Sequence, residues 1–284
     1  MIIGGPASQL LASKLAVTLN QCLALCDYKI FPDGEVYSRI ITELDENVIV
    51  IQSTPTDRDI IYLLQLLDIC QGKNVSLVIP YFGYSRQDKI FKDGEAMTAR
   101  ALAKAIDHCL SDESRVYLIN IHAPSILNYF SCRAENLDAT PLLANAMKSL
   151  CLQNPIIISP DKGAMAMAQS AAVYLDAPWD YLQKTRQSGT DILIAPKEVD
   201  VKTRDVIIFD DIISTGETMA SATTMLLKQG ANRVFLAAVH PVLIGSALIK
   251  LYRSGVSSVL ATDTLDKAIG TISVSTLIAQ ALKQ

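Results

Sequence analysis

The chain has 284 residues, of which half are hydrophobic and 19% are charged. This length favours two domains of ordinary size, and the composition supplies enough apolar surface for two buried cores. The formal net charge of -4 provides no basic field for gripping a nucleic-acid backbone, so DNA and RNA are not expected partners.

No apolar stretch is long enough to span a membrane, and Lys14 interrupts the first apolar run, so no signal-peptide pattern opens the chain. The six cysteines form neither a C-x-x-C pair nor a zinc-type spacing with histidine. We therefore expect a cytoplasmic protein with free thiols and no membrane partner.

Short apolar runs typical of strands alternate with amphipathic helical patterns along the chain. The predicted strands are Asn47–Gln52, Val75–Pro80, Val116–Ile121, Pro155–Ser159, Val206–Phe209 and Val234–Val239. The predicted helices are Ser8–Leu19, Asp57–Cys70, Met97–His108, Pro141–Leu150, Ala164–Leu175 and Glu217–Gln229. Because the strands are apolar at consecutive positions, both faces should be covered, which is typical of parallel sheets flanked by helices. The sequence predicts a doubly wound α/β architecture.

The two halves of the chain resemble each other. Residues 94–97 read Gly-Glu-Ala-Met and residues 115–122 read Arg-Val-Tyr-Leu-Ile-Asn-Ile-His, while residues 216–219 read Gly-Glu-Thr-Met and residues 233–240 read Arg-Val-Phe-Leu-Ala-Ala-Val-His. Chance similarity is the alternative, because unrelated helix starts often resemble one another, and so do unrelated strands. We interpret the pattern as two related domains, residues 1–140 and 141–284, with a last helix that can pack back on the first domain.

Residues 206–218 carry the sharpest chemical signal, because an apolar strand there leads through a small-residue loop into a helix. At the carboxyl end of a parallel strand, loop N–H groups and the helix N-terminus point at one place and form a phosphate site. The hydroxyls of Ser214, Thr215 and Thr218 add donors, and Gly216 lets the backbone approach a ligand. The alternative is an ordinary helix capped by Ser214 or Thr215.

Asp210 and Asp211 come directly before this loop. Two carboxylates cannot also bind phosphate, so they suit sugar hydroxyls or, through water, a metal ion. Residues 210–218 together therefore predict a phosphate site next to two acids that suit sugar hydroxyls or a metal ion.

Residues 206–218 resemble the phosphoribosyl-pyrophosphate loop shared by type I phosphoribosyltransferases and ribose-phosphate pyrophosphokinases. Residues 31–35 and 81–89 resemble the two nucleotide-binding stretches of the pyrophosphokinases. Residues 120–123 resemble their metal-binding histidine strand, residues 159–164 their pyrophosphate loop, and residues 184–186 the basic tip of their mobile catalytic loop. The motifs keep the order of the family and cover nearly the whole chain, whose short length is most similar to the archaeal-type enzymes.

The resemblance implies two type I phosphoribosyltransferase-like domains and assigns roles to individual residues. It implies ATP contacts at Phe31, Asp33, Gly34, Glu35, Arg86 and Gln87. It implies ribose 5-phosphate contacts at Arg186, Asp210, Asp211, Ser214, Thr215, Gly216, Glu217 and Thr218. It implies Mg²⁺ ligands at His122 and Asp161, and catalytic cations at Lys184 and Arg186. His240, the counterpart of His122 in the second half, is assigned a structural role.

Taken alone, several of these residues have ordinary structural interpretations. Asp33 and Glu35 suit a turn, Arg86 suits a surface ion pair, and His122 ends a predicted strand as a core histidine would. An Arg at a glycine- and tyrosine-rich strand exit can equally stack on adenine or bind phosphate.

The polar stretch Gln183–Thr190 has no apolar period and predicts an exposed, mobile loop carrying Lys184 and Arg186. Two cations in a loop that can close would neutralise charge during phosphoryl-type transfer and exclude water. A merely solvated charged loop is the alternative.

Some positions depart from the family pattern. Lys162, Gly163 and Ala164 stand where many members have paired glycines and an arginine, Ser214 where many have Asp, and Glu217 where many have a second glycine. These changes concern substrate affinity and regulation more than the type of reaction.

The resemblance implies transfer of pyrophosphate from Mg-ATP to ribose 5-phosphate, giving phosphoribosyl pyrophosphate and AMP, by a dimer-based homo-oligomer. One alternative is a phosphoribosyltransferase, which consumes that product and needs no ATP site. The other is a catalytically silent subunit associated with a synthetase.

Overall fold

The computed structural model describes residues 1–188, 191–195 and 199–284. The chain divides into two compact units. The first contains Met1–Asp138, Thr264–Asp266 and Ser273–Gln284, and the second contains Ala139–Asp263 and Lys267–Ile272. Each unit has its own parallel sheet and its own core.

The sheet of the first unit has the strand order β1-β4-β5-β6-β7, and every neighbouring pair is parallel. Its strands are β1 (Ile2–Gly4), β4 (Asn47–Ile51), β5 (Asn74–Ile79), β6 (Arg115–Ile119) and β7 (Arg133–Leu137). A separate antiparallel hairpin is formed by β2 (Cys26–Ile30) and β3 (Val36–Ile40), and a 3₁₀ helix covers Pro124–Tyr129.

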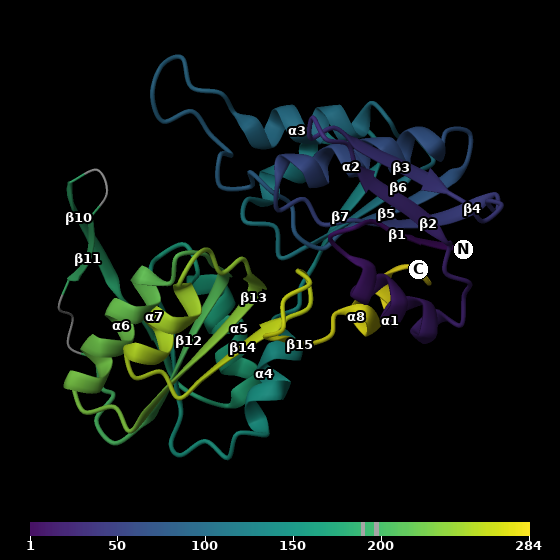
Figure 1. Ribbon diagram of the computed structural model, residues 1–284. Helices are drawn as coiled ribbons and strands as arrows, with labels where there is room; N and C mark the ends of the chain where they lie inside the picture. Colours follow the sequence, from purple (N-terminus) through teal and green to yellow (C-terminus); the bar gives the residue numbers. More distant parts are fainter. Residues whose placement is uncertain (189–190, 196–198) are drawn as a thin grey trace. The chain divides into compact units, whose positions relative to one another are not determined.

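Helices cover both faces of this sheet (Figure 1). On one face lie α2 (Asp57–Ile69) and α3 (Thr98–Asp107), whose leucines, alanines and isoleucine pack on alternate strand residues such as Val50 and Leu77. On the other face lie α1 (Gln9–Leu19) and α8 (Ser275–Ala281). The short segment Thr264–Asp266 also belongs to the first unit. The Ser53 Oγ hydroxyl donates to its Thr264 carbonyl at 2.7 Å.

The sheet of the second unit has the order β15-β14-β13-β12-β8-β9, again with all neighbours parallel. Its strands are β8 (Ile156–Ser159), β9 (Trp179–Tyr181), β12 (Asp205–Ile213), β13 (Arg233–Pro241), β14 (Ser258–Thr262) and β15 (Gly270–Ile272). A two-stranded antiparallel hairpin, β10 (Gln183–Ser188) and β11 (Asp191–Ala195), precedes β12.

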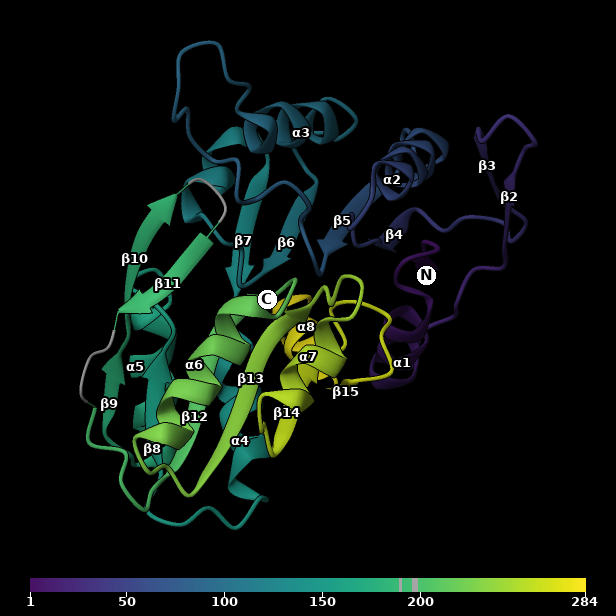
Figure 2. The same cartoon turned by 60° about the vertical axis from the view of Figure 1, so that its left-hand side comes forward.

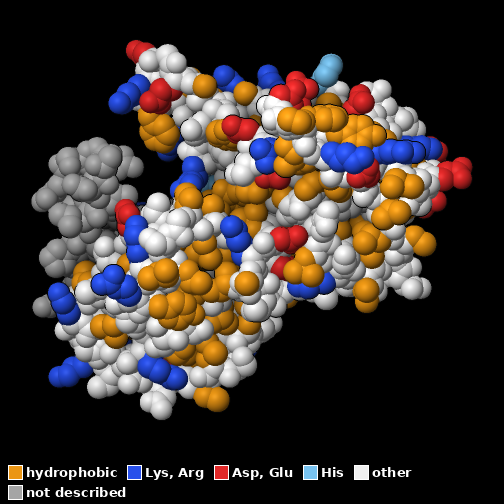
Figure 3. Space-filling view, in the orientation of Figure 1, with side chains coloured by type: hydrophobic (Ala, Val, Ile, Leu, Met, Phe, Trp, Pro, Cys, Tyr) orange, Lys and Arg blue, Asp and Glu red, His pale blue; other side chains and the backbone are white. Residues whose placement is uncertain are grey.

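The helices α4 (Thr140–Lys148) and α5 (Met165–Leu175) cover one face of this sheet, and α6 (Glu217–Lys228) and α7 (Ala247–Arg253) cover the other (Figure 2). The side of α7 that faces the sheet packs into a core with Val206, Ile208 and Leu236. The outer side of α7 is apolar as well, and exposed hydrophobic side chains gather over it in Figure 3. The exposed members there are Ile244, Leu248, Ile249 and Tyr252.

The prediction of an α/β fold with parallel, doubly covered sheets is confirmed, and all the predicted helices and strands are present. Their ends agree within two residues except for β12, which continues four residues beyond Phe209 to Ile213. The short strands β1, β7, β9, β14 and β15, the β2–β3 hairpin and α7 were not predicted.

The expectation of a loop over Gln183–Thr190 is wrong where the structure describes it, because Gln183–Ser188 is a strand paired with β11. Thr190 lies outside the described residues. A polar strand on a hairpin has no apolar face to bury, so it leaves no period in the sequence.

Among the described residues, no helix is both long and apolar enough to traverse a lipid bilayer.

Candidate active site

Asp210 and Asp211 lie within β12 rather than beyond its end. Asp210 is in register with Ala238 of β13, and the strand continues through Ile213. Both acidic residues are half-buried, and the Asp211 N–H donates to Asp210 Oδ1 at 3.0 Å. The pairing of Asp210 and Ile212 with β13 therefore fixes the backbone on either side of Asp211, six residues before α6 begins at Glu217.

The helix α6 begins without a side-chain cap. Its N-cap is Gly216 at φ +74°, and no side chain makes a capping hydrogen bond, so the interpretation of Ser214 or Thr215 as an ordinary cap is wrong. The first N–H groups of a helix have no intrahelical partner and carry its partial positive charge. The start of α6 can therefore accept an anion.

Close packing against the α7 region holds this loop in place. Leu243 N–H donates to the Ile213 carbonyl at 2.9 Å, and Ile244 N–H donates to the Ser214 carbonyl at 3.1 Å. A Cβ atom at position 216 would lie 3.2 Å from Leu251 Cγ. Glycine is thus favoured at position 216 by its left-handed backbone, and a side chain there would also be in tight contact with Leu251.

Glu217, predicted as a ribose 5-phosphate contact, is the first residue of α6. Its carboxylate accepts a hydrogen bond from Lys250 Nζ of α7 at 2.9 Å. Both side chains are exposed, so this ion pair adds little stability. A contact between Glu217 and a phosphate would use the backbone N–H, since the carboxylate is repelled by a phosphate.

Asp161 follows β8 and shapes the entry into α5. Its Oδ1 accepts the N–H groups of Gly163 at 2.8 Å and Ala164 at 3.2 Å, and the Ser159 hydroxyl donates to its carbonyl oxygen at 2.5 Å. Ile158 of β8 is in register with Ile208 of β12. Since both strands run in the same direction, Asp161 and the β12–α6 loop lie at the same edge of the sheet.

In the first unit, the stretch from Phe31 to Glu35 forms the tip of the β2–β3 hairpin. Phe31 N–H donates to the Glu35 carbonyl at 2.8 Å, and Glu35 N–H donates to Asp33 Oδ1 at 3.2 Å. Gly34, at φ +95°, completes the turn. The turn interpretation is therefore correct, and it leaves the side chains of this tip exposed, with Phe31 packing edge-on against Tyr37.

A cavity of about 450 Å³ adjoins this tip, between β3 and the start of α2. Glu35 lines it together with Asp57, Arg58 and Ile61. Arg58 carries no signal in the sequence, because it is an ordinary exposed position in the first turn of an amphipathic helix.

Arg86 and Gln87 lie in a turn after β5, and both are exposed. Gln87 N–H donates to the Tyr84 carbonyl at 2.8 Å. No ion pair joins Arg86 to a described carboxylate, so the surface ion-pair interpretation has no support in the described part of the chain.

His122 is exposed and lies three residues beyond Ile119, the last residue of β6. Both the strand-end position and the core-histidine alternative are therefore wrong. The segment before it is fixed by side chains: Asn120, at φ +37°, donates to Asp138 Oδ1 at 2.9 Å, and Ile121 N–H donates to Asn136 Oδ1 at 2.8 Å.

His240, by contrast, is inside β13 and only 3% exposed. Its register partner is Ile212 of β12. The burial of this histidine, one residue before the end of β13, fits the structural role expected for it.

No group of three or more His, Cys, Asp or Glu residues that could hold a metal ion occurs within the described ranges. Mg²⁺ in general keeps several waters and is commonly held by one or two carboxylates plus substrate phosphates. Asp161 offers the oxygen ligand that this ion prefers, and the exposed imidazole of His122 is the less typical ligand.

Lys184 and Arg186 lie on β10, where Lys184 is in register with Ile194 and Arg186 with Ile192. Their side chains lie outside the described residues. In sum, the predicted ribose 5-phosphate residues other than Arg186 lie between the last part of β12 and the first turn of α6. The predicted ATP residues divide between the hairpin tip and the β5 exit of the first unit.

Two family models match the chain. The first, described as the N-terminal domain of ribose phosphate pyrophosphokinase, matches residues 1–109, and the second, a phosphoribosyl transferase domain, matches residues 128–260. These matches confirm the prediction of two phosphoribosyltransferase-type domains.

Curated relatives match over the full length. A ribose-phosphate pyrophosphokinase of Methanosarcina acetivorans is 49% identical, with 100% of this chain and 99% of the relative covered. Ribose-phosphate pyrophosphokinase 2 of Archaeoglobus fulgidus is 39% identical, with 98% of each chain covered.

A solved structure is similar across the same length. The crystal structure of phosphoribosylpyrophosphate synthetase from Mycobacterium smegmatis superposes with a TM-score of 0.87 at 26% identity, covering 100% of this chain and 97% of that one. The family models, the full-length relatives and the solved structure all agree. The chain belongs to the ribose-phosphate pyrophosphokinase family.

Proposed function

We propose that this protein is a ribose-phosphate pyrophosphokinase, which transfers the β,γ-diphosphoryl group of Mg-ATP to the anomeric hydroxyl of ribose 5-phosphate. The products are phosphoribosyl pyrophosphate and AMP. The observation that carries the proposal is the match of residues 1–109 to the N-terminal domain of ribose phosphate pyrophosphokinase. Relatives with this name also match the chain over its full length. A phosphoribosyltransferase would account for the second unit alone.

The second unit supplies the sugar-phosphate site in this proposal. The 5-phosphate binds the N–H groups and hydroxyls of Ser214–Thr218, where α6 starts without a side-chain cap and its dipole favours an anion. Asp210 and Asp211, half-buried on β12 directly before this loop, accept hydrogen bonds from ring hydroxyls. The paired strands hold these carboxylates in place before the sugar arrives.

The first unit supplies the nucleotide contacts. The exposed side chains at the hairpin tip, Phe31, Asp33 and Glu35, contact the adenine and its ribose, as do Arg86 and Gln87 after β5. The guanidinium of Arg86, with no described ion-pair partner, is available to stack on adenine or to bind phosphate.

Mg²⁺, when bound with the triphosphate, neutralises part of its charge and leaves the phosphorus atoms open to attack. Asp161 and His122 would each contribute one ligand. The Asp161 carboxylate is already oriented by the two backbone N–H groups that open α5.

The reaction is a direct in-line displacement. The anomeric oxygen forms a bond to the β-phosphorus, the bond from that phosphorus to the bridging oxygen of the α-phosphate breaks, and AMP leaves. The hydroxyl proton passes to solvent or buffer. Lys184 and Arg186 on the β10–β11 hairpin stabilise the negative charge that shifts toward the leaving AMP.

The test is to incubate the purified protein with Mg²⁺, ATP and ribose 5-phosphate and to measure AMP together with phosphoribosyl pyrophosphate. The proposal requires equimolar amounts of both products, and none when ribose 5-phosphate is omitted. Consumption of phosphoribosyl pyrophosphate with a nucleobase would favour the phosphoribosyltransferase alternative. ATP binding without AMP release would favour the silent-subunit alternative.

A further inference from the structure

Tyr84 has a backbone conformation that tyrosine rarely adopts. Its φ is +60°, in the left-handed region, and it lies between the end of β5 and Arg86. Non-glycine residues in this region cost free energy and are retained where the surrounding structure fixes them, often at functional sites. The Tyr84 carbonyl accepts the Gln87 N–H at 2.8 Å. This one residue therefore closes the turn that carries Arg86 and Gln87.

The side chain of Tyr84 is fixed by α2. Its hydroxyl donates to Asp57 Oδ1 at 2.5 Å. This hydrogen bond raises the pKa of the Tyr84 phenol above its ordinary value. Asp57 is the first residue of α2, and the capping box of Thr56 and Asp59 holds that first turn. The acceptor is thus itself a rigid part of the fold.

The backbone before Tyr84 is fixed independently. Gly83 N–H donates to Thr54 Oγ1 at 2.8 Å, and a Cβ at position 83 would clash with the Thr54 carbonyl oxygen. The turn is therefore attached at Gly83 through the backbone and at Tyr84 through the hydroxyl. Between these attachments and α3, the side chains of Arg86 and Gln87 project from a defined backbone into solvent.

Asp57 also lines the cavity beside Glu35. One carboxylate thus adjoins the hairpin-tip stretch and holds the turn of the second nucleotide stretch. Neither Tyr84 nor Asp57 was singled out by sequence.

We propose that Tyr84, held by Asp57, is a positioning residue for ATP: it fixes the turn from which Arg86 and Gln87 contact the nucleotide. The inference rests on the proposed function, since that function is what makes Arg86 and Gln87 ATP contacts. Without the hydroxyl contact, the turn at Tyr84 loses its side-chain restraint and samples other conformations. ATP then binds only the fraction of molecules in which the turn has the right conformation, so the apparent affinity for ATP falls.

The direct test is Tyr84→Phe, which keeps the ring and removes the hydroxyl. The dissociation constant for Mg-ATP, measured by calorimetry without ribose 5-phosphate, and the KM for ATP should both rise by about five-fold, as for loss of one hydrogen bond. The kcat and the KM for ribose 5-phosphate should stay within a factor of two. The melting temperature should be unchanged, because both partners are exposed.

Substitutions of Asp57 provide a second test. Asp57→Ala should reproduce the ATP effect, and the double variant Tyr84→Phe/Asp57→Ala should be no worse than either single variant, because both remove the same contact. Asp57→Asn keeps an oxygen acceptor and should restore most of the affinity. Asp68→Ala, near the other end of α2, and Tyr252→Phe on α7 are matched controls and should bind ATP like the wild type.

The outcomes separate the inference from the function beneath it. If the wild type releases no AMP, the proposed function fails. If the wild type turns over and Tyr84→Phe binds ATP with unchanged affinity, the positioning role is refuted. Additive effects in the double variant, or equal losses for ATP, ribose 5-phosphate and thermal stability, would also refute it, since they indicate a general structural role.

Discussion

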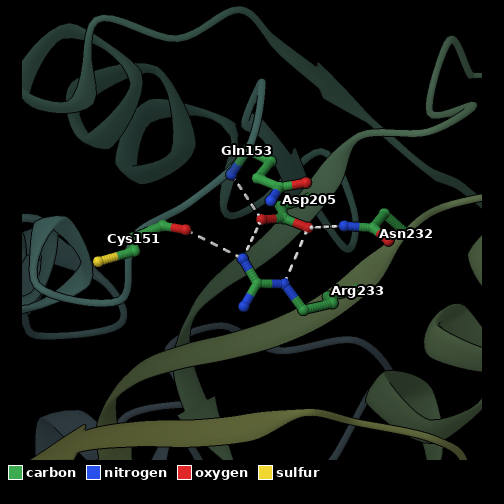
Figure 4. A network of polar contacts seen from close by, with 5 residues as sticks. All are labelled: Cys151, Gln153, Asp205, Asn232 and Arg233. Carbon is green, nitrogen blue, oxygen red and sulfur yellow. Dashed lines mark hydrogen bonds and ion pairs between the residues drawn. The ribbon is translucent and has the colours of Figure 1, made fainter.

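The Asp205 carboxylate accepts two hydrogen bonds from the Arg233 guanidinium, at 3.1 Å from Nε and 2.5 Å from a terminal nitrogen (Figure 4). The two residues are in register at the amino ends of β12 and β13. Asn232 Nδ2 and the Gln153 N–H also donate to this carboxylate, at 2.8 and 2.6 Å. Arg233 in turn donates to the Cys151 carbonyl at 3.1 Å, so the network ties the segment before β8 to the sheet.

This network predicts a large loss of stability on substitution. Asp205 is fully buried and Arg233 is partly exposed, so Asp205→Ala leaves donors unsatisfied at the sheet edge. We expect the free energy of unfolding to fall by about 2–3 kcal/mol, measured by urea denaturation at pH 7. The exposed pair of Asp200 with Arg204 is the control, and Asp200→Ala should cost about 0.5 kcal/mol or less. Equal effects of the two substitutions would contradict this account.

The same carboxylate predicts a dependence of stability on pH. Burial by itself raises the pKa of Asp205, but the hydrogen bonds from Arg233 and its neighbours outweigh burial and hold the pKa below its ordinary value. A depressed folded-state pKa gives stability that is complete above the unfolded-state pKa of about 4 and is lost as the pH falls through the folded-state value. Urea midpoints recorded from pH 7 down to pH 3 should therefore fall more steeply for the wild type than for Asp205→Asn. Parallel curves would rule out this contribution.

Removal of the positive charge of Lys184 on β10 should lower turnover and leave folding unchanged. Lys184→Ala should lower kcat by about 10²-fold or more, the size typical of losing one preorganised charge, with an unchanged melting temperature. AMP release at saturating substrates is the measurement. Lys228→Ala, at the far end of α6, is the control and should retain wild-type kcat. Near-normal turnover of Lys184→Ala would reject its role in the transition state.

Gly216→Ala should damage the sugar-phosphate site specifically. The substitution meets both the left-handed backbone at φ +74° and the packing against Leu251, so we expect the KM for ribose 5-phosphate to rise by at least about ten-fold. Gly72→Ala is a matched control, because Gly72 has φ +78° but open space around it. That variant should lose about 1 kcal/mol of stability and no affinity for ribose 5-phosphate. Equal KM values in the two variants would mean that the loop tolerates the shift.

His122 should influence the requirement for Mg²⁺. If its imidazole is a ligand, His122→Ala should raise the Mg²⁺ concentration for half-maximal activity at fixed ATP, because one of few protein ligands is lost. The exposed His108 at the end of α3 is the control, and His108→Ala should leave the Mg²⁺ dependence unchanged. A His122→Ala curve that coincides with the wild-type curve would leave Asp161 as the only proposed protein ligand.

The fold class, the central strands and the helices that cover them could be predicted from the pattern of residues along the chain. Consecutive apolar residues, as in Val206–Phe209, must avoid water on both faces of a strand, so their pattern favours a strand covered on both sides. The motif at residues 206–218 likewise placed acids, hydroxyls and a glycine in their order along the chain, and chain order is preserved in every conformation.

Tertiary structure decided what depends on partners distant in the sequence. β12 continues through Asp210 and Asp211 because Asp210 and Ile212 pair with β13, and Gln183–Ser188 is a strand because β11 pairs with it. His122 is exposed beyond β6, and Tyr84 is left-handed with its hydroxyl on Asp57. Residue type reports local preference and burial, whereas a hydrogen bond between separate elements is set only when the chain has folded and brought both groups together.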